Sequence, residues 1–302
     1  MVDISLLGCG GGMPMVNRFL SSTLINYKGR KILIDCGEGT QVSMRILGSG
    51  FKSIDCICIT HGHGDHIVGL PGLLATIGNS GRTDAITIIG PQGIENIING
   101  LRVISPYLPY EIKIIENPNV TLSIMDGIVL STLELNHSAP CIGYSFYFER
   151  KPKFDIDMAK ANNVPKSFWN TLQKGEVVID KGITYEPSMV LGKERVGIKI
   201  SLITDTRPIE TIPEFIKESD LFICEGTYAE DKDLEKAIKN KHMTFSEAAK
   251  LANKGCVNEL LLTHFSPAIC EPKLFKKAAT NIFENTIIGT DRFVKRLSFR
   301  NE

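Results

Sequence analysis

The sequence lacks an excess of charge of either sign. Its 34 Lys and Arg residues balance 34 Asp and Glu residues, so the formal net charge at pH 7 is zero. A neutral chain has no overall attraction to nucleic acid or to an anionic membrane. Any polyanionic substrate would therefore have to be held by local positive patches or by metal ions.

Long apolar runs and paired cysteines are also missing. No apolar run approaches transmembrane length, and the N-terminus has no basic segment followed by a long apolar stretch, so neither a membrane span nor a signal peptide is predicted. None of the eight cysteines has a partner at C-x-x-C spacing, and most lie in apolar runs, where cysteine behaves as a small buried hydrophobe. We therefore predict reduced thiols, a cytoplasmic protein and no membrane partner.

Internal repeats, low-complexity tracts and a nucleotide-binding P-loop are absent as well. The glycine-rich turn CGGGMP at residues 9–14 is not followed by G-K-[ST]. The 302 residues fit one large domain or two small ones. Predicted strands alternate first with turns and later with helices, which indicates an α+β fold of sandwiched sheets with helices outside.

Residues 149–195 differ from the rest of the chain. Charged residues and helix formers become more frequent there, and the apolar periodicity weakens. We predict an insertion with a short helix at 156–162, the only tryptophan, Trp169, and a small hairpin around 180–182. Composition leaves open whether this insertion is a solvated surface excursion or an arm that grips the substrate.

The stretch at residues 54–74 carries the strongest chemical signal. A β-branched strand ends in a loop where glycines alternate with four candidate metal ligands, His61, His63, Asp65 and His66. Imidazole nitrogens and carboxylate oxygens are the ligands that hydrolytic zinc prefers. A buried cluster of this kind would repel itself unless a cation neutralised it. The loop therefore predicts a metal site.

Three later predicted strands also end in candidate ligands, which are His137, Asp205 and His264. Strand ends on one edge of a sheet are where open sheet folds place their chemistry. Five histidines and two aspartates suffice for two metal ions if one aspartate bridges them. Two ions about 3.5–4 Å apart can clamp the attacking and leaving oxygens of a phosphodiester.

Three further polar residues have less certain roles. Asp35 ends a predicted strand, where it could cap the next helix or orient a metal-binding histidine. His242 lies in a loop and not after a strand, so it suits a general acid, although an exposed loop histidine is the alternative. Glu225, at another strand end, could orient His242.

The loop at 61–66 matches the H-x-H-x-D-H signature of the metallo-β-lactamase superfamily. More narrowly, the chain resembles the ribonuclease Z family, endonucleases that trim the 3′ end of precursor tRNA. The blocks that carry this resemblance, in chain order, are GCGGGMP, IDCGEGTQ, ITHGHGDHIVGLPGLL, IIGPQG, CEGTY and LTHFSP. The resemblance implies a four-layer αβ/βα sandwich, a homodimer, two zinc ions per subunit and precursor tRNA as the substrate.

The resemblance also implies roles for individual residues. One zinc ion would bind His61, His63 and His137, the other Asp65, His66 and His264, with Asp205 bridging. Asp65 would act as the base, and His242 as the acid with Glu225 as its partner. Arg18 and Thr244 would contact the substrate. The insertion at 149–195 would be a tRNA-binding arm within a single domain spanning 1–302.

Some family positions differ in this chain, and they leave an alternative open. The lysine and final asparagine of the family's loop around Arg18 are missing, and Ala268-Ile269 replaces an Arg-Tyr pair. Because such groups contact phosphate, the same core could instead hydrolyse small phosphodiesters or sulfate esters. A redox di-iron protein would favour Glu in place of His63. A catalytically dead binding module would have no chemical reason to keep seven ligands.

Overall fold

The first of two large sheets contains the chain's N-terminal strands. The computed structural model describes residues 1–118 and 121–300. The strand order of the first sheet is β16 (Val294–Leu297), β1 (Val2–Gly8), β2 (Ser22–Tyr27), β3 (Arg30–Ile34), β4 (Ile54–Cys58), β5 (Ile86–Gly90) and β6 (Ile112–Glu116). Strands β16 to β3 pair antiparallel, and β3 to β6 pair parallel.

The second sheet is built mainly from the C-terminal half. Its order is β15 (Thr286–Ile288), β14 (Leu260–Thr263), β13 (Leu221–Glu225), β12 (Arg195–Ile203), β9 (Ile142–Arg150), β8 (Ile128–Glu134) and β7 (Leu122–Met125). Strands β12 to β15 pair parallel. The parallel strands read as continuous apolar runs because both of their faces are covered, and every residue of β13 and β14 is buried.

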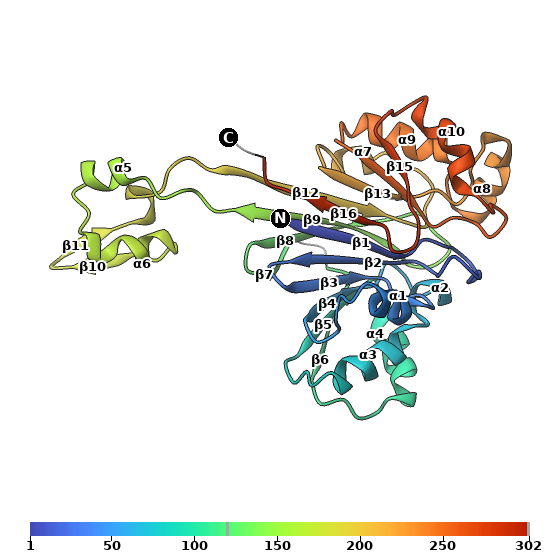
Figure 1. Ribbon diagram of the computed structural model, residues 1–302, viewed down its shortest axis with the longest axis horizontal. Coiled ribbons are helices and arrows are strands. Elements are labelled where there is room, and N and C mark those ends of the chain that lie inside the picture. The colour runs from blue at the N-terminus through green and yellow to red at the C-terminus, as the bar shows by residue number, and fades with distance from the viewer. Residues whose placement is uncertain (119–120, 301–302) are drawn as a thin grey trace. The chain divides into compact units, whose positions relative to one another are not determined.

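Helices cover the outer faces of both sheets (Figure 1). Beside the first sheet are α1 (Thr40–Ile46), α2 (Gly64–Ile67), α3 (Leu70–Asn79) and α4 (Ile94–Leu101). Beside the second are α7 (Ile212–Phe215), α8 (Leu234–Asn240), α9 (Phe245–Lys254) and α10 (Lys276–Thr280). This arrangement is the predicted αβ/βα sandwich. The strand predicted to begin at residue 120 starts outside the described residues.

The contacts divide the chain into two compact units. The larger unit comprises Met1–Tyr147 and Ile198–Ser298, and it contains every predicted site residue. The smaller unit comprises Phe148–Gly197 with the C-terminal segment that begins at Phe299, so it corresponds to the predicted insertion at 149–195.

The smaller unit has its own secondary structure and core. It contains α5 (Ile156–Ala161), α6 (Trp169–Gln173) and a hairpin of β10 (Val178–Asp180) and β11 (Ile183–Tyr185). Its hydrophobic core is a cluster of the buried residues Ala159, Val164, Leu172, Tyr185 and Val190, and Trp169 packs against it. The indole N–H of Trp169 donates a hydrogen bond to the Val164 carbonyl at 3.0 Å. The insertion is therefore a small packed unit, and α6 is an addition to the helix predicted there.

The cysteines are free thiols, and six of the eight are buried. This agrees with the predicted reduced state, and the cytoplasmic location stays a prediction. Within the described residues, no helix combines the length and hydrophobicity that crossing a lipid bilayer requires.

Candidate active site

The predicted site residues converge because they follow the ends of strands in both sheets. Asp35 follows β3, and His61 lies three residues after β4 ends at Cys58. In the second sheet Asp205 follows β12 and His264 follows β14. Asp35, Asp205 and His264 have φ values of 58°, 48° and 56°, in the left-handed region that non-glycine residues rarely adopt. Such backbone strain persists where the surrounding structure imposes it, and it concentrates at functional sites.

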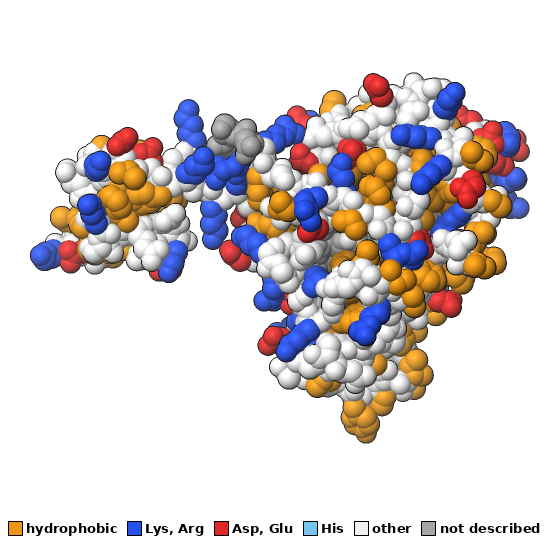
Figure 2. Space-filling model, viewed as in Figure 1, with side chains coloured by type: hydrophobic (Ala, Val, Ile, Leu, Met, Phe, Trp, Pro, Cys, Tyr) orange, Lys and Arg blue, Asp and Glu red, His pale blue; other side chains and the backbone are white. Residues whose placement is uncertain are grey.

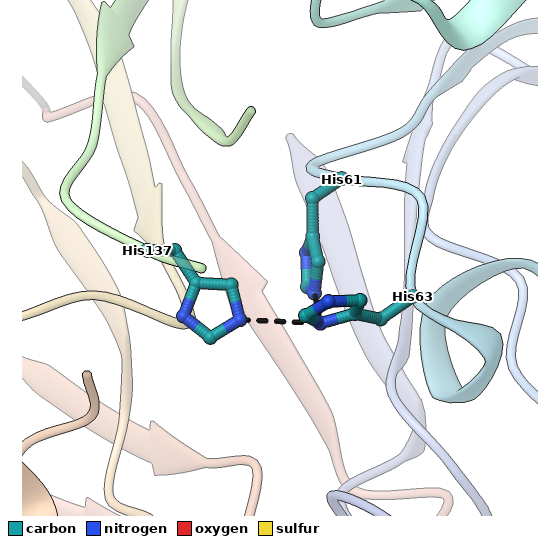
Figure 3. Close-up of side chains that lie close together, drawn as sticks. All are labelled: His61, His63 and His137. Atoms are coloured by element: carbon teal, nitrogen blue, oxygen red, sulfur yellow. Dashed lines mark hydrogen bonds between the residues drawn. The ribbon is translucent and has the colours of Figure 1, made fainter. Parts of the chain in front are cut away.

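Three histidines form the first group of candidate ligands (Figure 3). This histidine group consists of His61, His63 and His137, whose donor atoms lie within 4.8 Å of one another. His63 Nδ1 lies 3.0 Å from His61 Nε2 and 3.2 Å from His137 Nε2. His61 and His63 come from the loop after β4, whereas His137 comes from the segment after β8. The two sheets thus contribute to one cluster.

The second group mixes carboxylates with imidazoles. This mixed group consists of Asp65, His66, Asp205 and His264. Asp205 Oδ1 lies 3.4 Å from His66 Nε2 and 3.3 Å from His264 Nε2. Its other oxygen, Oδ2, lies 3.7 Å from His61 Nε2 in the histidine group. Asp205 therefore stands between the two groups, in the place that a bridging ligand would occupy.

Asp35 and Thr60 set the orientation of two of these imidazoles. Asp35 Oδ2 lies 2.7 Å from His66 Nδ1, and because an ionised carboxylate only accepts, His66 Nδ1 carries the proton. Thr60 donates its hydroxyl to Asp35 Oδ2 at 2.8 Å, which leaves its oxygen free to accept from His61 Nδ1 at 3.1 Å. Both rings then direct Nε2 toward the centre.

Glu225 and Thr227 repeat this arrangement on the second sheet. Thr227 donates its hydroxyl to Glu225 Oε2 at 2.6 Å, and its oxygen accepts from His264 Nδ1 at 3.0 Å. Glu225 is completely buried, and its Oε2 lies 3.2 Å from His242 Nδ1. One buried carboxylate thereby orients a candidate metal ligand, His264, and the candidate acid, His242.

The donor set fits metal ions. When Nδ1 donates its hydrogen to the outward partner, Nε2 of a neutral His66 or His264 carries a lone pair, and these two atoms face each other at 3.2 Å. The three donor nitrogens of the histidine group converge in the same way. Facing lone pairs repel unless a proton or a cation lies between them. Imidazole and carboxylate donors in two adjacent groups are the coordination chemistry of borderline divalent metals such as Zn²⁺.

The pKa shifts of His61 and Asp205 reflect both burial and the charges of the neighbouring site residues. Burial lowers the pKa of His61 well below its usual value, and the neighbouring His66 lowers it further. Burial raises the pKa of Asp205, but His264, His66 and His61 more than offset this and hold it well below the usual range. Asp205 is therefore a carboxylate, and His61 is neutral and able to bind a metal.

His242 has the opposite character. Burial lowers its pKa, but the Glu225 carboxylate more than compensates, and the pKa rises to about 9. The imidazole is therefore protonated near neutral pH. Since Glu225 occupies Nδ1, the proton on Nε2 is available to a bound molecule, as a general acid requires.

The glycine-rich turn after β1 closes one side of the site. The Gly12 N–H donates to Asp65 Oδ2 at 2.7 Å, and Gly12 has a φ of +77°. A Cβ on Gly11 would come within 2.4 Å of the His264 ring. The close approach to His264 therefore requires a glycine at position 11, and the positive φ favours one at position 12.

A cavity of about 500 Å³ opens over both groups. Its wall contains His242 and five of the seven candidate ligands, which are His63, Asp65, His137, Asp205 and His264. Ser138, Asn240 and Lys241 lie beside them. Lys241 also donates its amine to the His137 carbonyl at 2.8 Å. The cavity gives a substrate access to the ligands and to the acid at once.

The two predicted substrate contacts, Arg18 and Thr244, both have partners within the protein. Arg18 is only 8% exposed, and its guanidinium donates to the carbonyls of Ser266, Ile269 and Cys270 at 2.6–3.2 Å. Thr244 is fully buried, caps α9 and donates its hydroxyl to Asp231. Both side chains hold loops through these contacts, and their role in substrate binding stays a prediction.

Sequence reasoning did not single out Thr60 and Thr227. A signal was present, because Thr60 directly precedes His61 and Thr227 follows Glu225 by two residues. A hydroxyl beside a ligand or a carboxylate can relay a hydrogen bond between them. Only the folded chain shows that both hydroxyls do so.

Solved structures and curated relatives resemble the chain over nearly its whole length. The short form of human tRNase Z has a TM-score of 0.69 at 24% identity, covering 99% of this chain and 100% of its own. The metallo-β-lactamase fold protein YhfI from Bacillus subtilis has a TM-score of 0.69 at 19% identity, covering 98% and 100%. The chain therefore has the metallo-β-lactamase fold, with histidine and aspartate groups able to hold metal.

Ribonuclease Z from Clostridium beijerinckii is 65% identical to this chain, and the match covers 100% of each of the two chains. Ribonuclease Z from Clostridioides difficile is 60% identical, and the match covers 99% of each. The chain belongs to the ribonuclease Z family, as its sequence blocks predicted. A family model described as anti-Pycsar protein Apyc1 matches residues 2–102, a segment that includes the loop at 61–66.

Proposed function

We propose that this protein is an endoribonuclease that removes the 3′ trailer from precursor tRNA. Full-length identity of 65% to a ribonuclease Z supports this function. The observation that carries it is the cavity in which two metal-binding groups and an independently oriented acid, His242, face the same space. A phosphodiester with a poor leaving group needs both features.

We further propose zinc as the metal, with two ions per subunit. His61, His63 and His137 would hold one ion, and Asp65, His66 and His264 the other, with Asp205 shared. Bound ions would supply Lewis acidity at the scissile phosphate and a nucleophile at neutral pH. Elemental analysis of purified protein should find two zinc ions per chain, and one ion or none at saturating zinc would contradict this assignment.

The remaining chemistry falls to side chains of this chain. Asp65 has one oxygen held by the Gly12 N–H, which positions the carboxylate to take a proton from the attacking water. His242 gives its Nε2 proton to the departing ribose oxygen, while Glu225 stabilises the imidazolium. Thr227 keeps Glu225 in place for both tasks.

A side-by-side assay tests the proposal. Zinc-loaded protein is given a precursor tRNA with a 3′ trailer and, separately, bis-(p-nitrophenyl) phosphate. The proposal expects one cut after the discriminator base and hydrolysis of the small diester as well. Hydrolysis of the diester alone would reject the tRNA function and favour the small-phosphodiester alternative.

We propose that the smaller unit, Phe148–Gly197, is an RNA-binding arm. It exposes Lys160, Lys166, Lys174 and Lys181, which can contact phosphates. Replacing these four lysines with alanine is expected to lower kcat/KM for precursor tRNA roughly tenfold or more and to weaken its salt dependence. Hydrolysis of bis-(p-nitrophenyl) phosphate should not change.

Deletion of residues 152–194 provides the matched comparison for the arm. It should reproduce the loss on tRNA and spare the small diester, because the metal ligands all lie in the larger unit. Unchanged tRNA cleavage by both variants would show that this unit does not bind the substrate.

We also propose a homodimer formed through the face that carries α1 to α4. Large hydrophobic side chains are exposed there, and they are Val42, Ile46, Val68, Ile97, Val103, Ile104 and Tyr107. Figure 2 shows hydrophobic side chains over this part of the molecule. Exposed apolar surface of this kind marks interaction sites.

Sedimentation velocity tests the dimer. The wild-type protein should sediment as a dimer, and Ile46→Glu should shift it to a monomer, since a charge buried at an interface is costly. Leu274→Glu, at a comparably exposed position outside this face, is the control and should remain dimeric. A wild-type monomer at micromolar concentration would contradict the proposal.

A further inference from the structure

Three consecutive residues join the metal site to the loop that carries the acid. Asp205 stands between the two ligand groups. The next residue, Thr206, donates its backbone N–H to Glu225 Oε1 at 2.6 Å. Arg207 then extends its side chain to the segment that contains His242. One short stretch after β12 thus contacts the metal site, the partner of the acid and the acid's own backbone.

Arg207 makes a fork of hydrogen bonds around this loop. Its Nη1 donates to the His242 carbonyl at 2.5 Å and to Glu247 Oε2 at 2.9 Å, and its Nη2 pairs with Glu247 Oε1. Both charged side chains are mostly buried, with 18% and 16% of their surface exposed. Two-pronged pairing of guanidinium with carboxylate fixes geometry as well as contributing energy.

Glu247 passes this constraint to the other side of His242. Its side chain accepts the Thr244 backbone N–H at 3.0 Å as part of the capping box of α9. The carbonyl of residue 242 and the N–H of residue 244 are therefore both held by the Arg207–Glu247 pair. The backbone on the C-terminal side of the His242 side chain is therefore fixed at two points, the carbonyl of residue 242 and the N–H of residue 244.

The loop needs such a clamp because it has little regular structure of its own. Lys241 ends α8 with a φ of 57°, and α9 begins at Phe245, so three residues separate Lys241 from the first turn of α9. Glu225 holds the imidazole only at Nδ1, at 3.2–3.3 Å. A ring fixed at one atom can still swing with its backbone. The backbone anchors therefore decide where Nε2 points.

We propose that Arg207 is a positioning residue for the proton transfer by His242, acting through the His242 carbonyl and through Glu247. This inference rests on the proposed role of His242 as the acid. Arg207 touches neither the ligand groups' donor atoms nor the leaving oxygen; it holds the acid where it can reach that oxygen. A displacement of about 1 Å in such a group costs on the order of 10²-fold in rate.

The test compares Arg207→Met with the wild type on two substrates that differ in their need for an acid. On precursor tRNA, kcat should fall about 10²-fold while KM and zinc content stay the same. On bis-(p-nitrophenyl) phosphate the rate should stay near that of the wild type, because p-nitrophenolate leaves without protonation. Arg207→Lys retains the charge but not the two-pronged pairing, so its kcat on precursor tRNA should lie between those of the wild type and Arg207→Met. Lys295→Met removes a partly buried ion pair with Glu259 and is the control.

A double variant separates positioning from general structural support. In the His242→Ala background, Arg207→Met should cause no further loss, because the group that it positions is gone. Equal losses on both substrates, or additive losses in the double variant, would overturn the inference. If Arg207→Met does not fold, Glu247→Gln gives the same readout, since its amide can still accept from Thr244.

Failure of the proposed function has a different signature. If His242→Ala itself slows both substrates equally, the acid role is wrong. If His242→Ala discriminates between the substrates and Arg207→Met does not, only the positioning role is wrong.

Discussion

Replacing Asp205 with alanine is expected to release the bound metal and to abolish cleavage of precursor tRNA. Asp205 offers one oxygen to each ligand group, at 3.3–3.9 Å from four imidazole nitrogens. Removing one partner from a buried charged cluster costs about 3–5 kcal/mol. If the whole of this free energy is lost from metal binding, the binding weakens roughly 10²- to 4 × 10³-fold. Metal content after dialysis and kcat on both substrates are the measurements.

The loss should extend to the small diester, because both substrates depend on the same metal groups. Glu214→Ala removes an exposed carboxylate that pairs with Lys217, and it should leave metal content and turnover unchanged. An Asp205→Ala protein that retains two ions and normal turnover would show that the site has been assigned to the wrong residues.

Replacing His242 with alanine is expected to separate the two substrates. General acid catalysis contributes about 10²- to 10⁴-fold, so kcat on precursor tRNA should fall by that factor. Metal content should be unchanged because His242 pairs with Glu225 and belongs to neither the histidine group nor the mixed group, although its donor atoms also lie within 4.8 Å of those of His137 and Asp205. Hydrolysis of bis-(p-nitrophenyl) phosphate should be nearly normal, since its leaving group is already stable as an anion.

Two results would contradict this expectation. An equal loss on both substrates would remove His242 from the acid role. A loss of zinc would show that His242 is a metal ligand. Its Nδ1 lies 3.9 Å from Asp205 Oδ2, so zinc content is measured for this variant as well. Glu225→Gln should reproduce the His242→Ala pattern in milder form, because the amide still bonds Nδ1 but does not stabilise the imidazolium.

Much of the fold was predictable from local pattern. Continuous apolar runs such as DLFICE and ELLLT predicted buried strands, and β13 and β14 begin one residue later than predicted. Helix α9 was predicted at 245–253 from its amphipathic pattern, with Ser246 or Thr244 as its cap, and the structure shows that Thr244 caps it together with Glu247. Helix α6 was not predicted because its five residues are too short for a periodic signal.

The substrate contacts show where residue type is insufficient. Arg18 was predicted as a substrate contact from its place in a loop of the resembled family, and in the structure its guanidinium donates to three carbonyls from the loop at 266–270. Position in the chain cannot tell whether an arginine points into a cleft or into the protein. Arg207 went unnoticed for the same reason, since its partner Glu247 lies 40 residues away.

The sequence by itself determined the residue types of the metal site and the strands that carry them, because hydrophobic periodicity and ligand chemistry are local properties. Only the tertiary structure decided which nitrogen of each imidazole faces the centre, since the partners that hold the other nitrogen come from distant segments. Asp35 reaches His66 across 31 residues, and Thr227 reaches His264 across 37. These contacts exist only when parallel strands bring their ends together, and they make a set of ligands into an oriented site.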